Sequence, residues 1–162
     1  MKIQNPSFSR LLRDPVLLLA FGFGSGLAPR APGTFGTLAA IPFWWLMQGL
    51  SPAGYLGIVV VSALLGCYLC GAAAKKLGVH DHGGIVWDEM VGYWLTMWLA
   101  PQGWLWALYG FVLFRLFDIA KPAPVRWADR QVQGGIGIML DDILAAIYAG
   151  LVVQVTAWLV GV

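Results

Sequence analysis

The acidic residues of this chain are few, and they fall in short stretches that could together form one site. Charged residues make up 11% of the 162 positions, less than half of the roughly 25% found in an average soluble domain. Apart from Asp14, the acidic residues occupy three stretches and are Asp81, Asp88, Glu89, Asp118, Asp129, Asp141 and Asp142. Carboxylate oxygens are preferred ligands of Mg²⁺. If the stretches converge, the sequence predicts a site for a hard divalent cation.

Basic residues are interleaved with these carboxylates and could bind an anion. They are Arg115, Lys121, Arg126 and Arg130. Carboxylates that hold Mg²⁺ beside cations that hold phosphate are typical of a phosphate-processing site. The glycine-rich residues 22–26, with Arg30, Gly33 and Thr34 after them, could add donors to a phosphate. Gly22 and Gly26 are equally compatible with close helix packing.

Histidines, cysteines and a second glycine-rich stretch give weaker signals. The stretch at 80–84 indicates a polar loop, in which His80 or His82 could protonate a leaving alkoxide. Residues 134–137 indicate a flexible turn leading to Asp141. We interpret Cys67 and Cys70 as small buried apolar residues rather than as a redox or metal site, because no second cysteine pair accompanies them.

A purely structural explanation of these charges is also open. Asp88 and Glu89 could begin one helix, and Asp141 and Asp142 another, where acidic residues are stabilised by the helix dipole. Three pairs have the i,i+3 spacing of helical ion pairs: Arg115 with Asp118, Asp118 with Lys121, and Arg126 with Asp129. A charge within a membrane segment costs about 2.5–3.5 kcal/mol, which favours a functional role.

The composition indicates an integral membrane protein. Hydrophobic residues make up 59% of the chain, and the mean hydropathy is +0.74. A net charge of +2 and two cysteines argue against a nucleic-acid-binding protein and a disulfide-stabilised secreted module. Charge-free runs cover residues 15–29, 31–74, 90–114 and 143–162. A helix needs about 20 apolar residues to cross a bilayer, so three runs are long enough.

The breaks in these runs predict the helices. Residues 49–54 predict a turn between helices near 36–49 and 54–74. Residues 101–103 could kink one helix or separate a hairpin of helices near 88–100 and 104–117. The hairpin is favoured because it puts all ten Lys and Arg residues on one side.

The last predicted helix covers residues 143–162, and residues 15–30 either form a short span or re-enter the same face. We therefore predict a single all-α domain over residues 1–162. It would be a polytopic membrane helical bundle with four to five membrane helices.

Absent motifs narrow the reaction class. The sequence has no P-loop, no Cys-x5-Arg phosphatase loop, no HExxH and no GxSxG. A membrane phosphatase that uses several carboxylates is the enzyme class that remains.

Three segments of the chain resemble, in the same order, the signature blocks of the phosphatidylglycerophosphatase A family. They are residues 22–45, 78–94 and 114–142. The resemblance spans almost the whole chain. It implies a bacterial inner-membrane, Mg²⁺-dependent lipid phosphatase whose site faces the cytoplasm. The implied reaction converts phosphatidylglycerophosphate to phosphatidylglycerol. Membrane lipids, and no nucleic acid, would then be its partners.

The resemblance also implies that the charged stretches form one site. We expect metal ligands among Asp88, Glu89, Asp118, Asp141 and Asp142. We expect catalytic groups among Asp88, Asp118, Asp129 and His82. We expect the substrate phosphate to be bound by Arg30, Thr34, Arg115, Lys121, Arg126 and Arg130.

Other chemistries and functions stay open at this point. Water could attack the phosphate directly, or Asp88 or Asp118 could form an aspartyl-phosphate. The alternative functions are a small ion channel or transporter, and a scaffold subunit with interfacial ion pairs.

Overall fold

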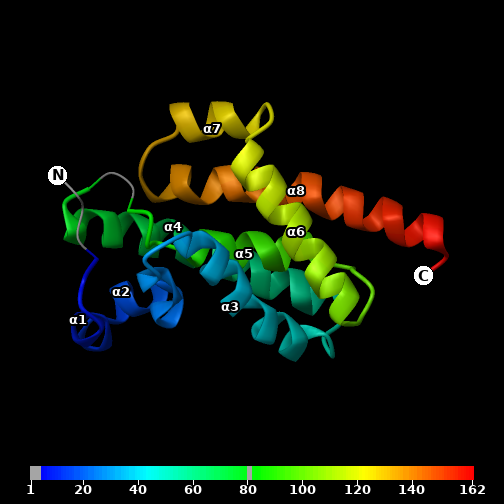
Figure 1. The fold of residues 1–162 in the computed structure, drawn as a ribbon, viewed down its shortest axis with the longest axis horizontal. Coiled ribbons are helices and arrows are strands. Elements are labelled where there is room, and N and C mark those ends of the chain that lie inside the picture. The colour runs from blue at the N-terminus through cyan, green and yellow to red at the C-terminus, as the bar shows by residue number, and fades with distance from the viewer. Residues whose placement is uncertain (1–4, 80–81) are drawn as a thin grey trace.

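The computed structural model describes residues 5–79 and 82–162, and this part of the chain is all-α (Figure 1). The helices in chain order are α1 (Phe8–Arg13), α2 (Pro15–Ala20), the 3₁₀ helix η1 (Gly22–Leu27), α3 (Pro32–Met47), α4 (Pro52–Leu77), α5 (Trp87–Thr96), α6 (Trp104–Ala120), α7 (Val125–Gln131) and α8 (Gly134–Val160).

Two of these helices, α4 and α8, are long and apolar enough to cross a membrane. They contain 26 and 27 residues, so each is about 40 Å long. Local sequence sets the ends of α4: Ser51 accepts a hydrogen bond from the N–H of Gly54, and Gly78 ends the helix with a left-handed φ of 70°. The all-α prediction is confirmed, whereas four to five spans remain a prediction.

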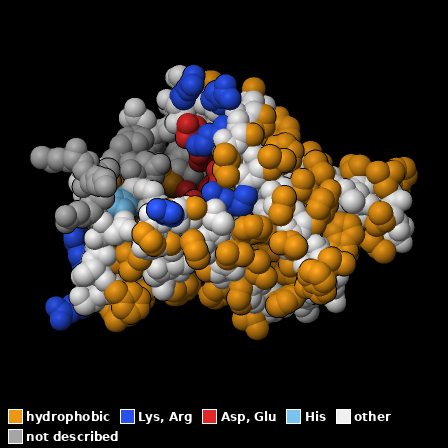
Figure 2. All heavy atoms as spheres, viewed as in Figure 1, with side chains coloured by type: hydrophobic (Ala, Val, Ile, Leu, Met, Phe, Trp, Pro, Cys, Tyr) orange, Lys and Arg blue, Asp and Glu red, His pale blue; other side chains and the backbone are white. Residues whose placement is uncertain are grey.

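The hairpin at residues 101–103 is confirmed. Helices α5 and α6 are separate and lie antiparallel, because Gly92 faces Phe114 while Met97 faces Gly110. Leu99, in the connection, has a left-handed φ of 62° that no continuous helix could contain. On the face drawn in Figure 2, the Lys and Arg side chains lie away from the C-terminal end of α8, as this hairpin predicts.

Residues 15–30 do not form one continuous helix. They divide into α2 and η1, six residues each, and an α-helix of six residues is only about 9 Å long. Phe23 and Gly24 have positive φ angles inside η1, which turns the chain back. Of the two alternatives for residues 15–30, one helical span does not fit these short helices, and re-entry into the same face remains a prediction.

The predicted start of the last helix, residue 143, is also wrong, because α8 begins at Gly134. Of the glycines that indicated a turn, Gly134 has a left-handed φ of 72° and open surroundings, whereas Gly135 packs against α4. A Cβ on Gly135 would lie 1.8 Å from the carbonyl oxygen of Cys67 in α4. Asp141 and Asp142 thus lie two turns inside a helix, where the helix dipole does not account for them.

Helix α8 is the centre of the fold and contacts α4, α5, α6 and α7. Its buried positions include Ala145, Ala146 and Ala149, whose small side chains allow neighbouring helices to approach closely. Hydrophobic side chains cover much of the outer surface away from the charged residues (Figure 2). Such a surface is compatible with lipid contact.

We predict that Gly135→Ala destabilises the fold by about 1–3 kcal/mol, because the added methyl overlaps the α4 backbone. The thermal unfolding midpoint of the detergent-solubilised protein measures this effect. Gly57→Ala, in open space on α4, is the matched control and should leave the midpoint unchanged or raise it. Equal midpoints for Gly135→Ala and the wild type would contradict the close α4–α8 crossing.

Candidate metal and phosphate site

Three carboxylates from two helices converge in the interior. Asp88 and Glu89 lie in the first turn of α5, and Asp142 comes from the third turn of α8. One oxygen from each lies within 4.8 Å of the others. Asp88 and Asp142 are 8% and 3% exposed, and the Glu89 side chain is 15% exposed. The structure therefore brings together residues from two separate sequence stretches.

The environment of these three carboxylates fits a divalent cation. Asp88 Oδ1 and Glu89 Oε2 are buried without a hydrogen-bond partner among the described residues. Gathering buried carboxylates is unfavourable unless a cation or protons compensate for their charge. The donor set is entirely oxygen, as a hard divalent cation prefers.

Gly33 in α3 makes room for this cluster, whereas the sequence analysis considered it only as a possible backbone donor to a phosphate. A Cβ at this position would lie 2.1 Å from Glu89 Oε1 and 3.0 Å from Arg115 Nη1. Only glycine leaves the Glu89 carboxylate in its place. The sequence signal was a glycine in the first turn of a helix, directly after Pro32, where a packing role is hard to recognise.

Asp118 joins the cluster from the last turn of α6. Its Oδ2 lies 2.6 Å from Arg115 Nη1, and the same guanidinium lies 3.7 Å from Glu89 Oε1. The carboxyl of Asp118 also interacts with that of Asp142. The predicted i,i+3 pair of Arg115 and Asp118 is confirmed, and Arg115 neutralises carboxylates from within the site.

Asp141 and Asp129 form a second group around Lys121. The Nζ of Lys121 donates to Asp141 Oδ2 at 2.8 Å and to Asp129 Oδ1. Burial by itself lowers the pKa of Lys121, but hydrogen bonds and negative charge from both carboxylates outweigh it and raise this pKa above its usual value. The ammonium therefore stays protonated and ties the end of α6 to α7 and α8.

Two of the three predicted helical ion pairs do not form among the described residues. Lys121 binds Asp129 and Asp141 rather than Asp118, and Asp129 binds Lys121 rather than Arg126. The reason is that α6 ends at Ala120, and the chain then turns so that α7 brings Asp129 back to Lys121.

The remaining cations lie on the surface near the acidic site. Arg30, Arg126 and Arg130 are exposed. Thr34 follows Gly33 in α3 and is half-buried. Figure 2 shows acidic side chains gathered on one face with basic side chains beside them. These cations are free of the ion pairs that occupy Arg115 and Lys121 in the described part of the chain.

His82 lies in the segment before α5 and is 4% exposed. Its Nδ1 accepts a hydrogen bond from the Gly84 N–H at 3.0 Å, and its ring lies 5.4 Å from that of Phe21. These contacts lie outside the carboxylate cluster. His80 and Asp81 lie outside the described residues.

The first glycine-rich stretch packs against neighbouring segments. Cβ atoms at Gly22 and Gly26 would meet Val86 at 2.8 Å and the Gly84 carbonyl oxygen at 2.0 Å. This supports the packing explanation of these glycines. Cys67 and Cys70 form no disulfide within the described residues, and Cys70 lies close enough to Asp88 to interact with it electrostatically.

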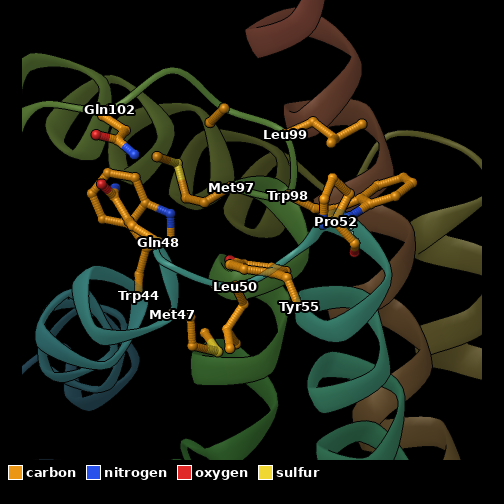
Figure 3. A pocket seen from close by; sticks show the side chains of 11 residues that line it. Trp44, Met47, Gln48, Leu50, Pro52, Tyr55, Met97, Trp98, Leu99 and Gln102 are labelled. Atoms are coloured by element: carbon orange, nitrogen blue, oxygen red, sulfur yellow. Dashed lines mark hydrogen bonds between the residues drawn. The ribbon is translucent and has the colours of Figure 1, made fainter.

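A separate cavity lies at the opposite end of the bundle (Figure 3). It has a volume of about 120 Å³ and lies where α3 and α5 end and α4 and α6 begin. Trp44, Tyr55 and Met97 line it together with Gln48 and Gln102. With no charged side chain among its lining residues, it lacks the groups that would bind phosphate or a divalent cation.

Comparison with known proteins identifies the family. The profile described as phosphatidylglycerophosphatase A matches residues 18–157. The chain belongs to the phosphatidylglycerophosphatase A family. Every described carboxylate of the site lies within the matched range.

Two relatives are named phosphatidylglycerophosphatase A. One, from Escherichia coli strain K12, is 54% identical over 141 residues, which cover 86% of this chain and 82% of the relative. The other, from Haemophilus influenzae, is 47% identical over 155 residues, which cover 94% of this chain and 95% of the relative. No solved structure matches the chain.

We predict that Gly33→Ala weakens binding of a divalent cation, because the added methyl displaces the Glu89 carboxylate. The measurement is the rise in the unfolding midpoint as MgCl₂ or MnCl₂ is added to metal-free protein. Gly83→Ala, whose Cβ would meet nothing within 4 Å, is the control and should respond like the wild type. If the unfolding midpoint of Gly33→Ala rose with metal concentration as it does in the wild type, the position of the Glu89 carboxylate would not matter for cation binding.

Proposed function

We propose that this chain is a phosphatidylglycerophosphatase, which hydrolyses the terminal phosphate monoester of phosphatidylglycerophosphate to phosphatidylglycerol and phosphate. The observation that carries the proposal is the buried group of Asp88, Glu89 and Asp142 in a member of this family. The names of the two relatives support the same substrate.

We assign Asp88, Glu89 and Asp142 as the ligands of Mg²⁺, with Asp118 at the edge of the site. Bound there, the ion would neutralise phosphate oxygens during phosphoryl transfer. Asp141 was also expected to be a metal ligand, but its hydrogen bond to Lys121 favours a positioning role. The same holds for Asp129, which was expected to be catalytic.

In the proposed reaction, a water oxygen forms a bond to phosphorus while the bond from phosphorus to the glycerol oxygen breaks, and the glycerol oxygen takes up a proton from water to become the free hydroxyl of phosphatidylglycerol. We assign Asp118 as the group that accepts the proton of the water, because it borders the three clustered carboxylates without belonging to them. Arg115 holds Asp118 in position through their 2.6 Å ion pair.

The exposed cations are proposed to bind the phosphates of the substrate. Arg126 and Arg130 on α7 and Arg30 before α3 are on the surface, and Thr34 adds a hydroxyl. Arginine suits this role because its guanidinium matches phosphate geometry. Arg115 and Lys121 would act indirectly, since their charges are engaged by carboxylates.

We further propose a single multi-pass domain in the bacterial inner membrane, with the site facing the cytoplasm. The clustering of Lys and Arg at the site end of the bundle supports this orientation. Helices α3 and α6, with 16 and 17 residues, are about 24–26 Å long and would also span if the bilayer thins locally. Together with α4 and α8 they give four spans, and the shorter α5 would be the fifth.

We predict that purified protein releases phosphate from phosphatidylglycerophosphate in Mg²⁺ and loses this activity in EDTA. Asp88→Asn and Asp142→Asn should each lower kcat/KM at least about 100-fold, since each removes a charged oxygen ligand. The control is Asp14→Asn, which removes a carboxylate that is paired with Lys76. The Asn side chain can still cap α2 as Asp14 does. Full activity of both site variants would support the scaffold alternative, and activity insensitive to EDTA would remove the metal from the proposal.

We predict that Arg126→Ala and Arg130→Ala raise KM more than they lower kcat, because exposed cations contribute to substrate attraction. The effect should shrink as the salt concentration increases, since salt screens surface charge. Steady-state kinetics in mixed micelles at low and high salt measure it. Arg13→Ala, on α1, is the control for general loss of positive charge. Equal KM increases in all three variants would contradict a specific role for α7.

A further inference from the structure

A second polar cavity lies at the start of α3, where Pro32 is one of its lining residues. It has a volume of about 420 Å³, and its lining residues are Asn5, Ala28, Pro29, Pro32, His82, Gly83 and Gly84. None of these side chains is charged. The cavity therefore suits a neutral polar group better than a phosphate.

His82 supplies this cavity with a hydrogen-bond donor. Its Nδ1 accepts the Gly84 N–H, so the neutral ring carries its proton on Nε2. Nε2 is buried and has no partner within the described residues. A buried donor without an acceptor is unfavourable, which points to a ligand oxygen as the missing partner.

The fold fixes this histidine firmly. Gly84 and Gly26 pack with almost no space between them, since a Cβ on Gly26 would lie 2.0 Å from the Gly84 carbonyl oxygen. On one side the Phe21 ring lies against the imidazole. The histidine is thus oriented in advance, as a recognition residue needs to be.

The cavity and the carboxylate cluster are close enough to serve one ligand. Pro32 lines the cavity, and the next residue, Gly33, lies against Glu89 and Arg115. A ligand with its phosphate at the cluster could therefore place a neighbouring group in the cavity.

We propose that this cavity binds the glycerol unit of the lipid headgroup and that His82 Nε2–H donates to its free hydroxyl. This inference rests on the proposed function, in which the glycerol lies next to the phosphate that is removed. It makes His82 a specificity residue, whereas the sequence analysis considered it a proton donor to the leaving group.

The test compares two substrates that differ by this hydroxyl alone. One is phosphatidylglycerophosphate, and the other is the analogue in which 1,3-propanediol replaces the headgroup glycerol. We expect the wild type to prefer the natural substrate about tenfold in kcat/KM, as the loss of one hydrogen bond predicts. His82→Asn keeps an acceptor for Gly84 and lacks a donor at the position of Nε2, so it should lose this preference, because kcat/KM falls more on the natural substrate than on the analogue.

His82→Gln is the matched control, because its amide can offer a donor near the position of Nε2 and should retain part of the preference. A wild type that hydrolyses both substrates equally well would overturn the glycerol assignment. An equal loss of kcat on both substrates in His82→Asn would also overturn it and favour the proton-donor role. Absence of phosphate release from either substrate by the wild type would instead overturn the proposed function, and the inference with it.

Discussion

The arrangement depends on burying carboxylates close to one another. Asp88, Glu89 and Asp142 place oxygens within 4.8 Å, and Asp118 adjoins them, while Arg115 is the cation paired directly with this group. Such an excess of negative charge in a protected interior is stable only with a further cation or with bound protons. Other features of the fold serve this constraint. Gly33 leaves space for Glu89, and the small residues of α8 allow α5 to bring its two carboxylates against Asp142.

The cations divide into two roles according to burial. Arg115 and Lys121 lie within the site and hold carboxylates, so their charge is already compensated. Arg30, Arg126 and Arg130 are exposed at the same end of the bundle and can attract phosphates. The opposite end contains an uncharged cavity between two turns. This asymmetry between the two ends gives the bundle a direction, which agrees with a substrate whose charged headgroup lies at one membrane face.

Charge-free runs and their breaks were sufficient to predict the α3–α4 turn, the α5–α6 hairpin and the gathering of cations at one end. The start of α8 was not predictable from local signals. Gly134, Gly135 and Gly137 have low helix propensity, and tertiary contacts explain two of them. Gly135 packs against the α4 backbone, and Gly137 packs against the carbonyl of Val132. Pairing around Lys121 was missed for a related reason, since it depends on the direction of α7 after a turn at residues 121–124. Residue types predicted the chemistry, whereas tertiary packing decides which carboxylate faces which cation.

The central claim is that Asp88, Glu89 and Asp142 together hold a divalent cation. The most direct measurement is a crystal structure of the protein grown with MnCl₂, with anomalous scattering used to locate the ion. The account predicts one anomalous peak bonded to oxygens of all three residues, at the side of the site that Gly33 leaves open. A peak bound elsewhere, or a cluster without metal at saturating MnCl₂, would contradict it.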